Sequence, residues 1–529
     1  MLENIHTAWG SGSTNVLAVL PTGAGKTIIF ARIMADHDGP CVAIAHRQEL
    51  VGQISVALAL NSVCHRIVGP RAVIKAVVRA QFEATGRTYY DPAAPVAVAG
   101  VDTLVRRGYD GGDRVTLWVQ DEAHHVLTRN KWGSAAALFP NARGLGVTAT
   151  PTRADGAGLG RHADGVFDRL LVGPSMRALI GNGYLTDYRI FAPPSDLDLS
   201  VVPVSLATGD YSAPRLRTAV RESTIMGDLV EHYGRIGRGR LGVTFVTDVQ
   251  TANDVADAFC AAGVPAAAVS HKTADVERGA LLRRFRHREL LQLVNVDLFG
   301  EGFDLPAIEI VSFGRPTESY ALFAQQFGRS LRPLAGKDRA VIIDHVGNVV
   351  RHGLPDANRR WSLDRRKRRR EPDPDVIPVR TCPECTAAYE RIHRVCPWCG
   401  FYAEPTSRSA PEFVDGDLLE LDEVSLTKLR GGIEHVDMSD VDYRHHLLER
   451  HCPAPGILRN VRRHSERRDT VGRLRDAIAL WGARQRSAGR SDSESYRRFY
   501  LRYGVDVLTA QTVAAVEAAA LEERILRDV

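Results

Sequence analysis

Short apolar runs recur through residues 1–350, and a polar or amphipathic stretch follows each of them. A first set covers residues 15–20, 41–46, 96–101, 116–122 and 144–150, and a second set covers residues 242–247, 266–270, 291–297, 308–313 and 340–345. Strands without polar alternation are typical of parallel sheets that helices cover on both faces. The pattern therefore predicts an α/β fold with two tandem, doubly wound parallel-sheet lobes.

Changes in composition divide the 529 residues into several segments. At roughly 150 residues per domain, this length suggests about three or four domains. The predicted order is a first lobe (1–192), a Pro-containing linker (193–222), a second lobe (223–355), a basic and Pro-rich linker (356–380), a Cys module (381–402) and a helical region (420–529).

The composition, 44% hydrophobic and 25% charged, is that of an ordinary soluble globular protein. No run approaches the roughly 18 consecutive apolar residues of a membrane span. The start, MLENIHTAWG, lacks the basic and apolar regions of a secretory signal. We therefore expect a cytoplasmic protein without a membrane partner.

A glycine-rich loop follows the first apolar run and precedes a helical stretch. Its residues are Pro21, Thr22, Gly23, Ala24, Gly25, Lys26 and Thr27. Glycines at 23 and 25 let backbone N–H groups approach phosphates, Lys26 can reach the β- and γ-phosphates, and the Thr27 hydroxyl can ligate Mg²⁺. The loop predicts nucleotide binding, and the alternative is a structural glycine turn.

The second motif is acidic: DEAH, at residues 121–124, ends the apolar run that begins at residue 116. A carboxylate at the end of a parallel strand beside a phosphate loop can hold Mg²⁺, which is the predicted role of Asp121. Glu122 is expected on the opposite side of the pleat, where it can polarise the attacking water. Alone, the four letters could be an ordinary helix start.

Together these motifs resemble the superfamily 2 helicases of the DEAD/DEAH type, over residues 1 to about 350. AHRQEL (45–50) resembles motif Ia, GVDTL (100–104) motif Ib, TATPTR (148–153) motif III and FVTDV (245–249) motif IV. The later motifs look closest to bacterial RadD-type and phage-encoded recombination or repair helicases. The resemblance implies two RecA-like lobes, ATP hydrolysis and movement on nucleic acid, with DNA favoured over RNA. Repair or replication proteins are possible partners, and the host would be a bacterium or a phage-infected cell.

Motifs V and VI complete the resemblance in the second lobe. Gly302 and Asp304 match the motif V pattern, and Gln325, Arg329 and Arg332 fit the motif VI pattern Q-x-x-G-R-x-x-R. The resemblance implies that all five contribute to the nucleotide site and that His124 contacts Gln325.

The motif VI positions are spaced for one face of a helix, with Thr317 as a candidate N-cap. Two arginines from a second lobe would neutralise the charge of phosphoryl transfer, so hydrolysis would depend on lobe closure. Alternatively, both are solvated surface charges.

The family's adenine-reading Gln precedes the first helix, and LENIHTAW would align just after it. Either this contact is missing or it lies upstream of Met1. The preference for ATP therefore comes from the resemblance alone.

Four of the eight cysteines form two C-x-x-C pairs: Cys382, Cys385, Cys396 and Cys399. Four thiolates at this spacing can converge on Zn²⁺ without an open coordination position, which predicts a structural metal. An iron–sulfur cluster or a redox pair is the alternative. The module is too small to fold without the metal.

Positive charge is concentrated next to this module. Residues 351–370 hold nine Arg or Lys against two Asp, whereas the whole chain has a net charge of only +5. The run suggests either a polyanionic partner or a solvated linker. Arg391, Arg394 and Trp398 would add charge and a stacking surface for nucleic acid, and the alternative is a folding unit that staples the tail.

The sequence therefore predicts an ATP-dependent DNA helicase or translocase, with replication, recombination or repair as its setting. The alternatives are a motor subunit of a restriction-type complex and an RNA helicase. A binding module without catalysis is disfavoured because the hydrolytic carboxylates and both arginines are present.

Overall fold

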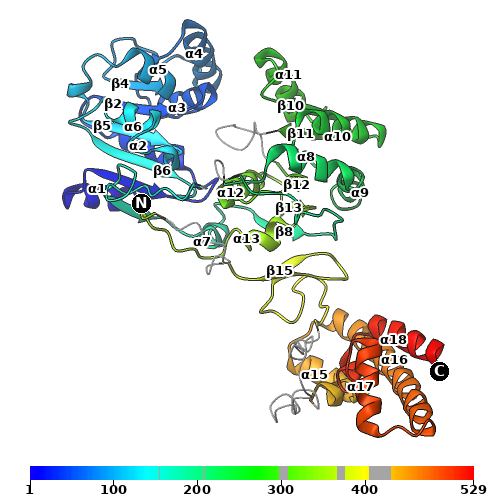
Figure 1. The fold of residues 1–529 in the computed structure, drawn as a ribbon. Coiled ribbons are helices and arrows are strands. Elements are labelled where there is room, and N and C mark those ends of the chain that lie inside the picture. Colours follow the sequence, from blue (N-terminus) through cyan, green and yellow to red (C-terminus); the bar gives the residue numbers. More distant parts are fainter. Residues whose placement is uncertain (154, 206–208, 297–307, 366–375, 404–430) are drawn as a thin grey trace. The chain divides into compact units, whose positions relative to one another are not determined.

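The computed structural model describes residues 1–153, 155–205, 209–296, 308–365, 376–403 and 431–529 (Figure 1). The chain forms two compact units, one of Met1–Thr381 with Thr386–Glu390 and one of Cys382–Cys385 with Arg391–Val529. No helix within the described ranges combines the length and apolar character needed to cross a membrane.

The first lobe is built on a seven-stranded parallel sheet with the strand order β3-β4-β2-β5-β6-β1-β7. Its strands are β1 (Asn15–Val19), β2 (Cys41–Ala45), β3 (Arg66–Val68), β4 (Val96–Gly100), β5 (Leu117–Asp121), β6 (Arg143–Thr148) and β7 (Arg169–Val172). Its helices are α1 (Leu2–Gly10), α2 (Lys26–Ala35), α3 (Gln48–Leu60), α4 (Arg71–Thr85), α5 (Val101–Arg107) and α6 (Lys131–Ala136), with the 3-10 helices η1 (Gly112–Arg114) and η2 (Ala123–His125).

Alternate residues of these strands enter two separate cores, as the period of two in a strand requires. Val16 and Ala18 pack with residues of α1 to α4, whereas Leu17 packs on the other face with residues of α5 and α6. Both faces are therefore covered by helices, and the apolar runs without alternation have this physical cause.

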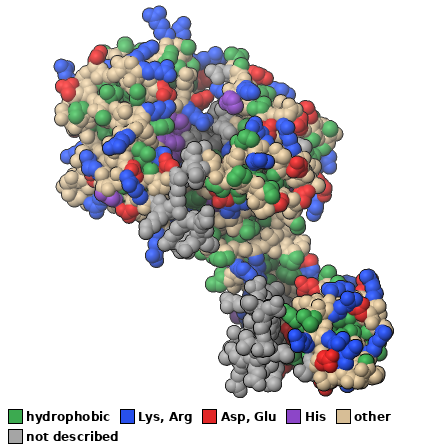
Figure 2. Space-filling model, viewed as in Figure 1, with side chains coloured by type: hydrophobic (Ala, Val, Ile, Leu, Met, Phe, Trp, Pro, Cys, Tyr) green, Lys and Arg blue, Asp and Glu red, His purple; other side chains and the backbone are tan. Residues whose placement is uncertain are grey.

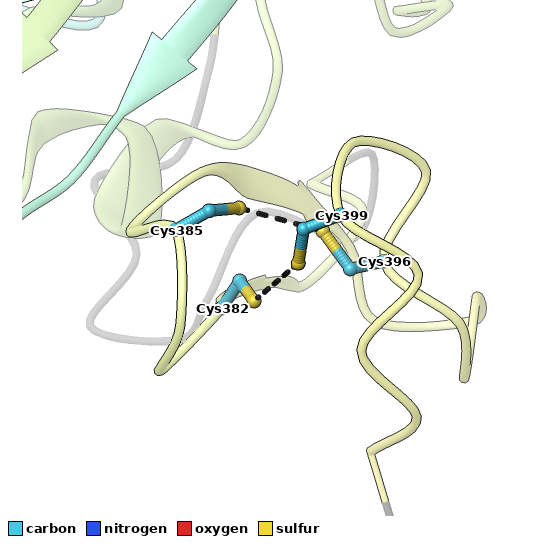
Figure 3. A group of neighbouring side chains, drawn as sticks. All are labelled: Cys382, Cys385, Cys396 and Cys399. Carbon is cyan, nitrogen blue, oxygen red and sulfur yellow. Dashed lines mark hydrogen bonds between the residues drawn. The ribbon is translucent and has the colours of Figure 1, made fainter. Parts of the chain in front are cut away.

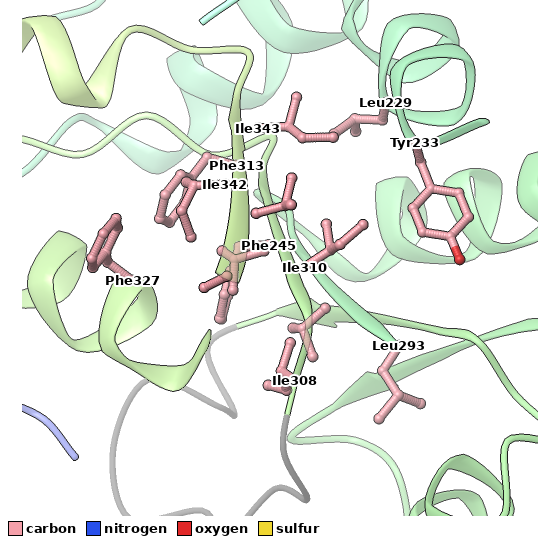
Figure 4. Packing of buried hydrophobic residues seen from close by; sticks show 14 of the residues in the cluster. Leu229, Tyr233, Phe245, Leu293, Ile308, Ile310, Phe313, Phe327, Ile342 and Ile343 are labelled. Carbon is pink, nitrogen blue, oxygen red and sulfur yellow. The ribbon is translucent and has the colours of Figure 1, made fainter. Parts of the chain in front are cut away.

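The second lobe has a six-stranded parallel sheet with the order β10-β11-β9-β12-β13-β8. Its strands are β8 (Asp187–Phe191), β9 (Gly242–Phe245), β10 (Ala266–Ser270), β11 (Gln292–Val296), β12 (Ile310–Phe313) and β13 (Arg339–Asp344). Its helices are α7 (Met176–Gly181), α8 (Ala213–Glu222), α9 (Ile225–Ile236), α10 (Val249–Ala261), α11 (Asp275–Arg286), α12 (Tyr320–Gly328) and α13 (Asn348–His352), with the 3-10 helix η3 (Arg329–Leu331). Aromatic and branched side chains, among them Phe245, Ile310 and Phe313, fill its core (Figure 4).

The second lobe begins earlier than the sequence predicted. Strand β8 pairs in parallel with β13, so residues 187–191 belong to the second sheet although they were assigned to the first lobe (1–192). The predicted linker, 193–222, contains helix α8. Strand β8 lies at the edge of the sheet, so only alternate residues are buried and its sequence does not form an apolar run.

The residues after α13 return to the first lobe, whereas the sequence predicted a linker at 356–380. Leu363 is 8% exposed and packs in the core beneath α5 and α6. Its carbonyl accepts the N–H of Gly160, and Arg365 Nε donates to Asp164 at 2.7 Å. Residues 354–365, which we name the strap, are therefore part of the first unit.

The second unit joins the Cys module to a helical bundle. Its helices are α15 (Asp440–Glu449), α16 (Ala454–Ser487), α17 (Asp492–Tyr503) and α18 (Ala515–Asp528), with the 3-10 helix η4 (Thr509–Thr512). Trp481 of α16, Phe499 of α17 and Leu521 of α18 share one core. The two-stranded sheet of β14 (Val379–Thr381) and β15 (Ala388–Glu390) belongs to the first unit.

Candidate nucleotide and nucleic-acid site

The glycine-rich loop connects β1 to α2, as the sequence predicted. Gly23 and Gly25 have φ values of 87° and 78°, in the left-handed region that disfavours residues with a Cβ. Lys26 is the first residue of α2, so the loop leads directly to a helix N-terminus, where backbone N–H groups and the helix dipole favour anions. These features fit the phosphates of a nucleotide.

Asp121 and Glu122 are both buried at the carboxyl end of β5. Asp121 is the last residue of the strand, and its Oδ1 accepts the N–H of Glu122 at 2.9 Å. Burial, reinforced by the charge of Glu122, raises the pKa of Asp121, and the nearby Lys26 acts in the opposite direction. The loop and the acidic motif are thus brought together, which fits a cation between Thr27 and Asp121.

Glu122 does not continue the pleat, which corrects the predicted position on its opposite side. The strand ends at Asp121, and Glu122 has a left-handed φ of 49°. A left-handed conformation in a residue with a long side chain is strained and is typical of functional sites.

Two groups contact the Glu122 carboxylate. His124 Nδ1 lies 3.5 Å from Glu122 Oε2 and 3.0 Å from the hydroxyl of Thr148, at the end of β6. From the second lobe, Gln325 Nε2 donates to Glu122 Oε2 at 3.4 Å. The predicted partner of Gln325 was His124, and the structure connects the two residues through Glu122.

The end of α12 differs from the single helical face that the sequence predicted. The α-helix stops at Gly328, Arg329 opens the 3-10 helix η3, and Arg332 is extended. The end of α12 also packs closely on the phosphate loop of the first lobe. A Cβ on Gly328 would lie only 2.4 Å from the Cβ of Thr22.

The N-cap of α12 is Ser319, whose side chain accepts the N–H of Leu322, and not Thr317 as predicted. The Thr317 hydroxyl instead donates to Asp210. The remaining predicted residues of the second lobe, Gly302 and Asp304, lie outside the described residues.

A cavity of about 350 Å³ opens beside the carboxyl ends of β2, β3 and β4. It is lined by motif Ia residues, including Arg47, and by Arg106 and Arg107 next to motif Ib. The N-termini of α3 and α4 border it, at Gln48 and after Pro70. Arginines and helix N-termini on one concave surface favour phosphate groups.

Sequence reasoning missed Arg106 and Arg107. The two adjacent arginines that follow GVDTL after Val105 were an available signal, because positive charge close to a nucleic-acid motif favours a phosphate contact.

The four module cysteines converge, with their Sγ atoms all within 4.8 Å of one another (Figure 3). Cys382 Sγ lies 3.5 Å from Cys399 Sγ, and Cys385 Sγ lies 3.8 Å from Cys396 Sγ. A tetrahedral zinc with Zn–S bonds of about 2.3 Å needs S–S separations of about 3.8 Å. The cluster therefore fits Zn²⁺.

The module packs on α16. Asn460 donates to the carbonyl of Gly400 at 2.9 Å and accepts the N–H of Tyr402 at 3.1 Å, and Arg463 forms an ion pair with Glu384. The Cys cluster consequently anchors the first turns of this helix.

Several arginines of the basic run are engaged within the first unit. Arg351 pairs with Glu318 at 2.9 Å, and the Arg359 guanidinium lies 3.6 Å from the ring centroid of Tyr320. With Arg365 on Asp164, these contacts fold the run onto the lobes as far as residue 365, and residues 366–370 lie outside the described part.

Two family models match the lobes. Residues 1–153 match the model described as "Type III restriction enzyme, res subunit", and residues 225–333 match "Helicase conserved C-terminal domain". The chain is a superfamily 2 helicase. A third model, "Ribosomal L32p protein family", matches residues 358–408, which include the Cys module of this helicase.

Curated relatives agree with this assignment. The "51.5 kDa protein" of a Lactococcus phage is 29% identical over 77% of this chain and 82% of its own length. "Putative ATP-dependent helicase IRC3" of Saccharomyces cerevisiae is 26% identical over 64% of this chain and 49% of its own length. "DNA 3'-5' translocase XPB2" of Sulfurisphaera tokodaii is 25% identical, over 68% and 82% respectively.

The chain thus spans about half the length of the yeast relative and most of the other two. The matches support an ATP-dependent DNA helicase or translocase. The RadD-type resemblance stays a prediction, and so do the roles of the individual site residues.

Proposed function

We propose that this helicase couples ATP hydrolysis between its two lobes to movement on DNA. The observation that carries the proposal is the contact of Glu122 with both lobes, through His124 of the first and Gln325 of the second. A change in lobe closure would displace the Gln325 amide from Glu122. Hydrolysis and lobe movement are thereby linked at one side chain.

The proposed roles follow from chemistry and position. Lys26 and the backbone of residues 21–27 would hold the phosphates, while Thr27 and Asp121 would hold Mg²⁺, which supplies charge neutralisation there. Glu122 would accept a proton from the attacking water. Arg329 and Arg332 would offset the negative charge that develops on the transferred phosphoryl group.

DNA would run along the cavity at the carboxyl ends of β2, β3 and β4, which we name the groove. Arg47, Arg106 and Arg107 would contact its phosphates, which carry no base identity, so binding would be largely independent of sequence. The XPB2 translocase supports DNA as the track. Replication, recombination or repair is the proposed setting.

Zn²⁺ in the Cys module would act structurally. The contacts of Asn460 with Gly400 and Tyr402 support a role in holding together the second unit, which we also call the helical unit. A direct nucleic-acid contact by Arg391, Arg394 and Trp398 would add to this role.

Steady-state ATP hydrolysis tests the proposal. The full chain is assayed without nucleic acid and with single-stranded DNA, double-stranded DNA, forked DNA or RNA of equal length. Stimulation by DNA above RNA is expected, and Lys26→Ala, which removes the phosphate contact, should abolish all turnover. Equal rates with and without every nucleic acid would contradict a motor function.

A motor subunit of a restriction-type complex is the second candidate, favoured by the family match of residues 1–153. Such a subunit would translocate on double-stranded DNA without separating its strands. Triplex displacement together with a forked-duplex unwinding assay distinguishes the two: displacement without unwinding favours the second candidate.

A further inference from the structure

A run of aromatic rings, partly buried at His46, His125 and Trp132 and buried at His124, lies in the first lobe. The His46 ring, at the groove, lies 5.5 Å from the His125 ring with 61° between their planes. His125 stacks on Trp132 of α6 at 4.9 Å and 18°, and its centroid lies 4.1 Å from that of His124. The rings therefore lead without a gap from the groove to the DEAH motif.

The inner end of this run contacts the proposed base. His124 Nδ1 lies 3.5 Å from Glu122 Oε2 and 3.0 Å from the Thr148 hydroxyl. A shift of the His124 ring would consequently move its contact with Glu122.

The outer end has a second connection to the groove. Lys131 Nζ lies 4.7 Å from the centroid of the Trp132 ring and pairs at 2.9 Å with Asp102, which lines the cavity. Two residues that line the cavity therefore connect to the stacked pair of rings: His46, which follows β2, directly, and Asp102 of α5 through Lys131.

The backbone around the stack is held tightly. Asn130 donates to the carbonyl of His125 at 2.8 Å and caps α6 by accepting the N–H groups of Trp132 and Gly133. A Cβ on Gly133 would lie 2.1 Å from the Leu127 carbonyl oxygen. His125 and Trp132 are therefore held in one closely packed unit, and close packing of this kind favours transmitting a displacement over absorbing it.

We propose that His125, stacked on Trp132, is a positioning residue that transmits occupancy of the nucleic-acid groove to Glu122 through His124. DNA phosphate bound beside His46 and Arg47 displaces the His46 ring, and the His125–Trp132 pair carries this displacement to His124. The proposal rests on the proposed function, and ring packing rather than a proton on His125 carries the signal.

The test is His125→Ala in the full chain, with ATP turnover measured at zero and at saturating single-stranded DNA. Basal kcat, the KM for ATP and the Kd for DNA are expected to stay near their wild-type values. The ratio of stimulated to basal kcat should fall by about 2- to 30-fold, the range of coupling that one residue carries. His125→Phe retains a ring on Trp132 and should restore the ratio.

Two further variants complete the design. Trp132→Leu keeps an apolar side chain but removes the stacked ring, and it should reproduce the reduced ratio if His125→Ala does not fold. His162→Ala is the matched control, because its ring contacts Asp364 on the surface of the same lobe. This control should keep the wild-type ratio.

A wild-type ratio in folded His125→Ala, or in folded Trp132→Leu if the first variant fails to fold, would overturn the proposal. Failure of folded His125→Phe to restore the ratio would overturn it as well. Failure of the proposed function has a different signature, since the wild-type chain itself would then show no stimulation by DNA.

Discussion

Glu122 is the side chain on which the proposed hydrolysis depends most. It is 7% exposed, strained at φ 49° and contacted from both lobes. A strained and buried carboxylate beside a phosphate loop persists only where the surrounding structure holds it, which favours catalysis over a structural role.

Glu122→Gln should lower kcat by about 10²- to 10⁴-fold, because a neutral amide cannot accept the proton of the attacking water. ATP binding should be nearly unchanged, since Lys26 and the loop remain. Turnover and the Kd of a fluorescent ATP analogue are the two measurements. Hydrolysis at the wild-type rate would remove Glu122 from the role of base.

Arg329→Ala and Arg332→Ala should each lower kcat far more than they raise the KM for ATP. Both arginines would act on charge that develops only in the transition state. Steady-state kinetics at saturating DNA separate the two constants. A change in KM alone would indicate ground-state binding, and an unchanged pair of constants would indicate surface charges.

Several residues of the site could be predicted because their chemistry is local. The loop at 21–27 and Asp121 at a strand end follow from the sequence. The left-handed turn at Glu122 and the packing of His125 on Trp132 could not, because no residue type or spacing encodes them. Such features arise from tertiary contacts that override local preference.

At the scale of elements, α12 determines how closely the second lobe approaches the phosphate loop. Its last residue, Gly328, has the helical φ of −62°, so the reason for glycine is space and not backbone freedom. A methyl group there would lie 2.4 Å from Thr22 Cβ, closer than carbon atoms approach without movement.

Gly328→Ala should therefore lower kcat by about 10²-fold, the effect of a misplacement of roughly 1 Å at a catalytic site. The fold should survive, because alanine suits a helix end and the lobes can separate slightly. Gly234→Ala in α9 is the matched control, since nothing lies within 4 Å of the added methyl. Full activity of Gly328→Ala would contradict the close approach.

Elements buried on both faces were predictable, whereas edge and connecting elements were not. Strands β1, β2, β5 and β6 coincide with apolar runs, because their neighbours exclude water on both sides. The strap at 354–365 resembled a basic linker, yet Leu363 enters a core. A composition average over a basic segment does not reveal individual apolar contacts such as those of Leu354 and Leu363.

At the scale of the whole molecule, the helical unit carries a mixed surface charge. Figure 2 shows Lys and Arg side chains gathered over this unit, interspersed with acidic ones. Arg473 pairs with Glu522 and Arg475 with Asp437, at 3.4 and 2.7 Å. Surface pairs of this kind contribute little stability, so the Cys module and the shared apolar core hold the unit together.

Cys385→Ser with Cys396→Ser should abolish zinc binding and lower the thermal unfolding temperature of the helical unit. The variant removes two thiolate ligands, and the hydrogen bonds of Gly400 and Tyr402 with Asn460 depend on the folded module. Basal ATP hydrolysis should persist, because every proposed nucleotide residue lies in the first unit. Zinc content, the thermal unfolding temperature by calorimetry and basal ATP turnover are measured on the same preparation.

The same variant tests whether the module binds DNA directly. The slope of log K against log salt concentration should flatten by about 0.7 to 0.9 for each DNA phosphate that the protein no longer neutralises. Cys64→Ser is the matched control, because this exposed cysteine lies outside the metal cluster. An unchanged slope in a zinc-free variant would leave the module a purely structural role. A flatter slope with unchanged basal turnover would place part of the DNA track outside the two lobes.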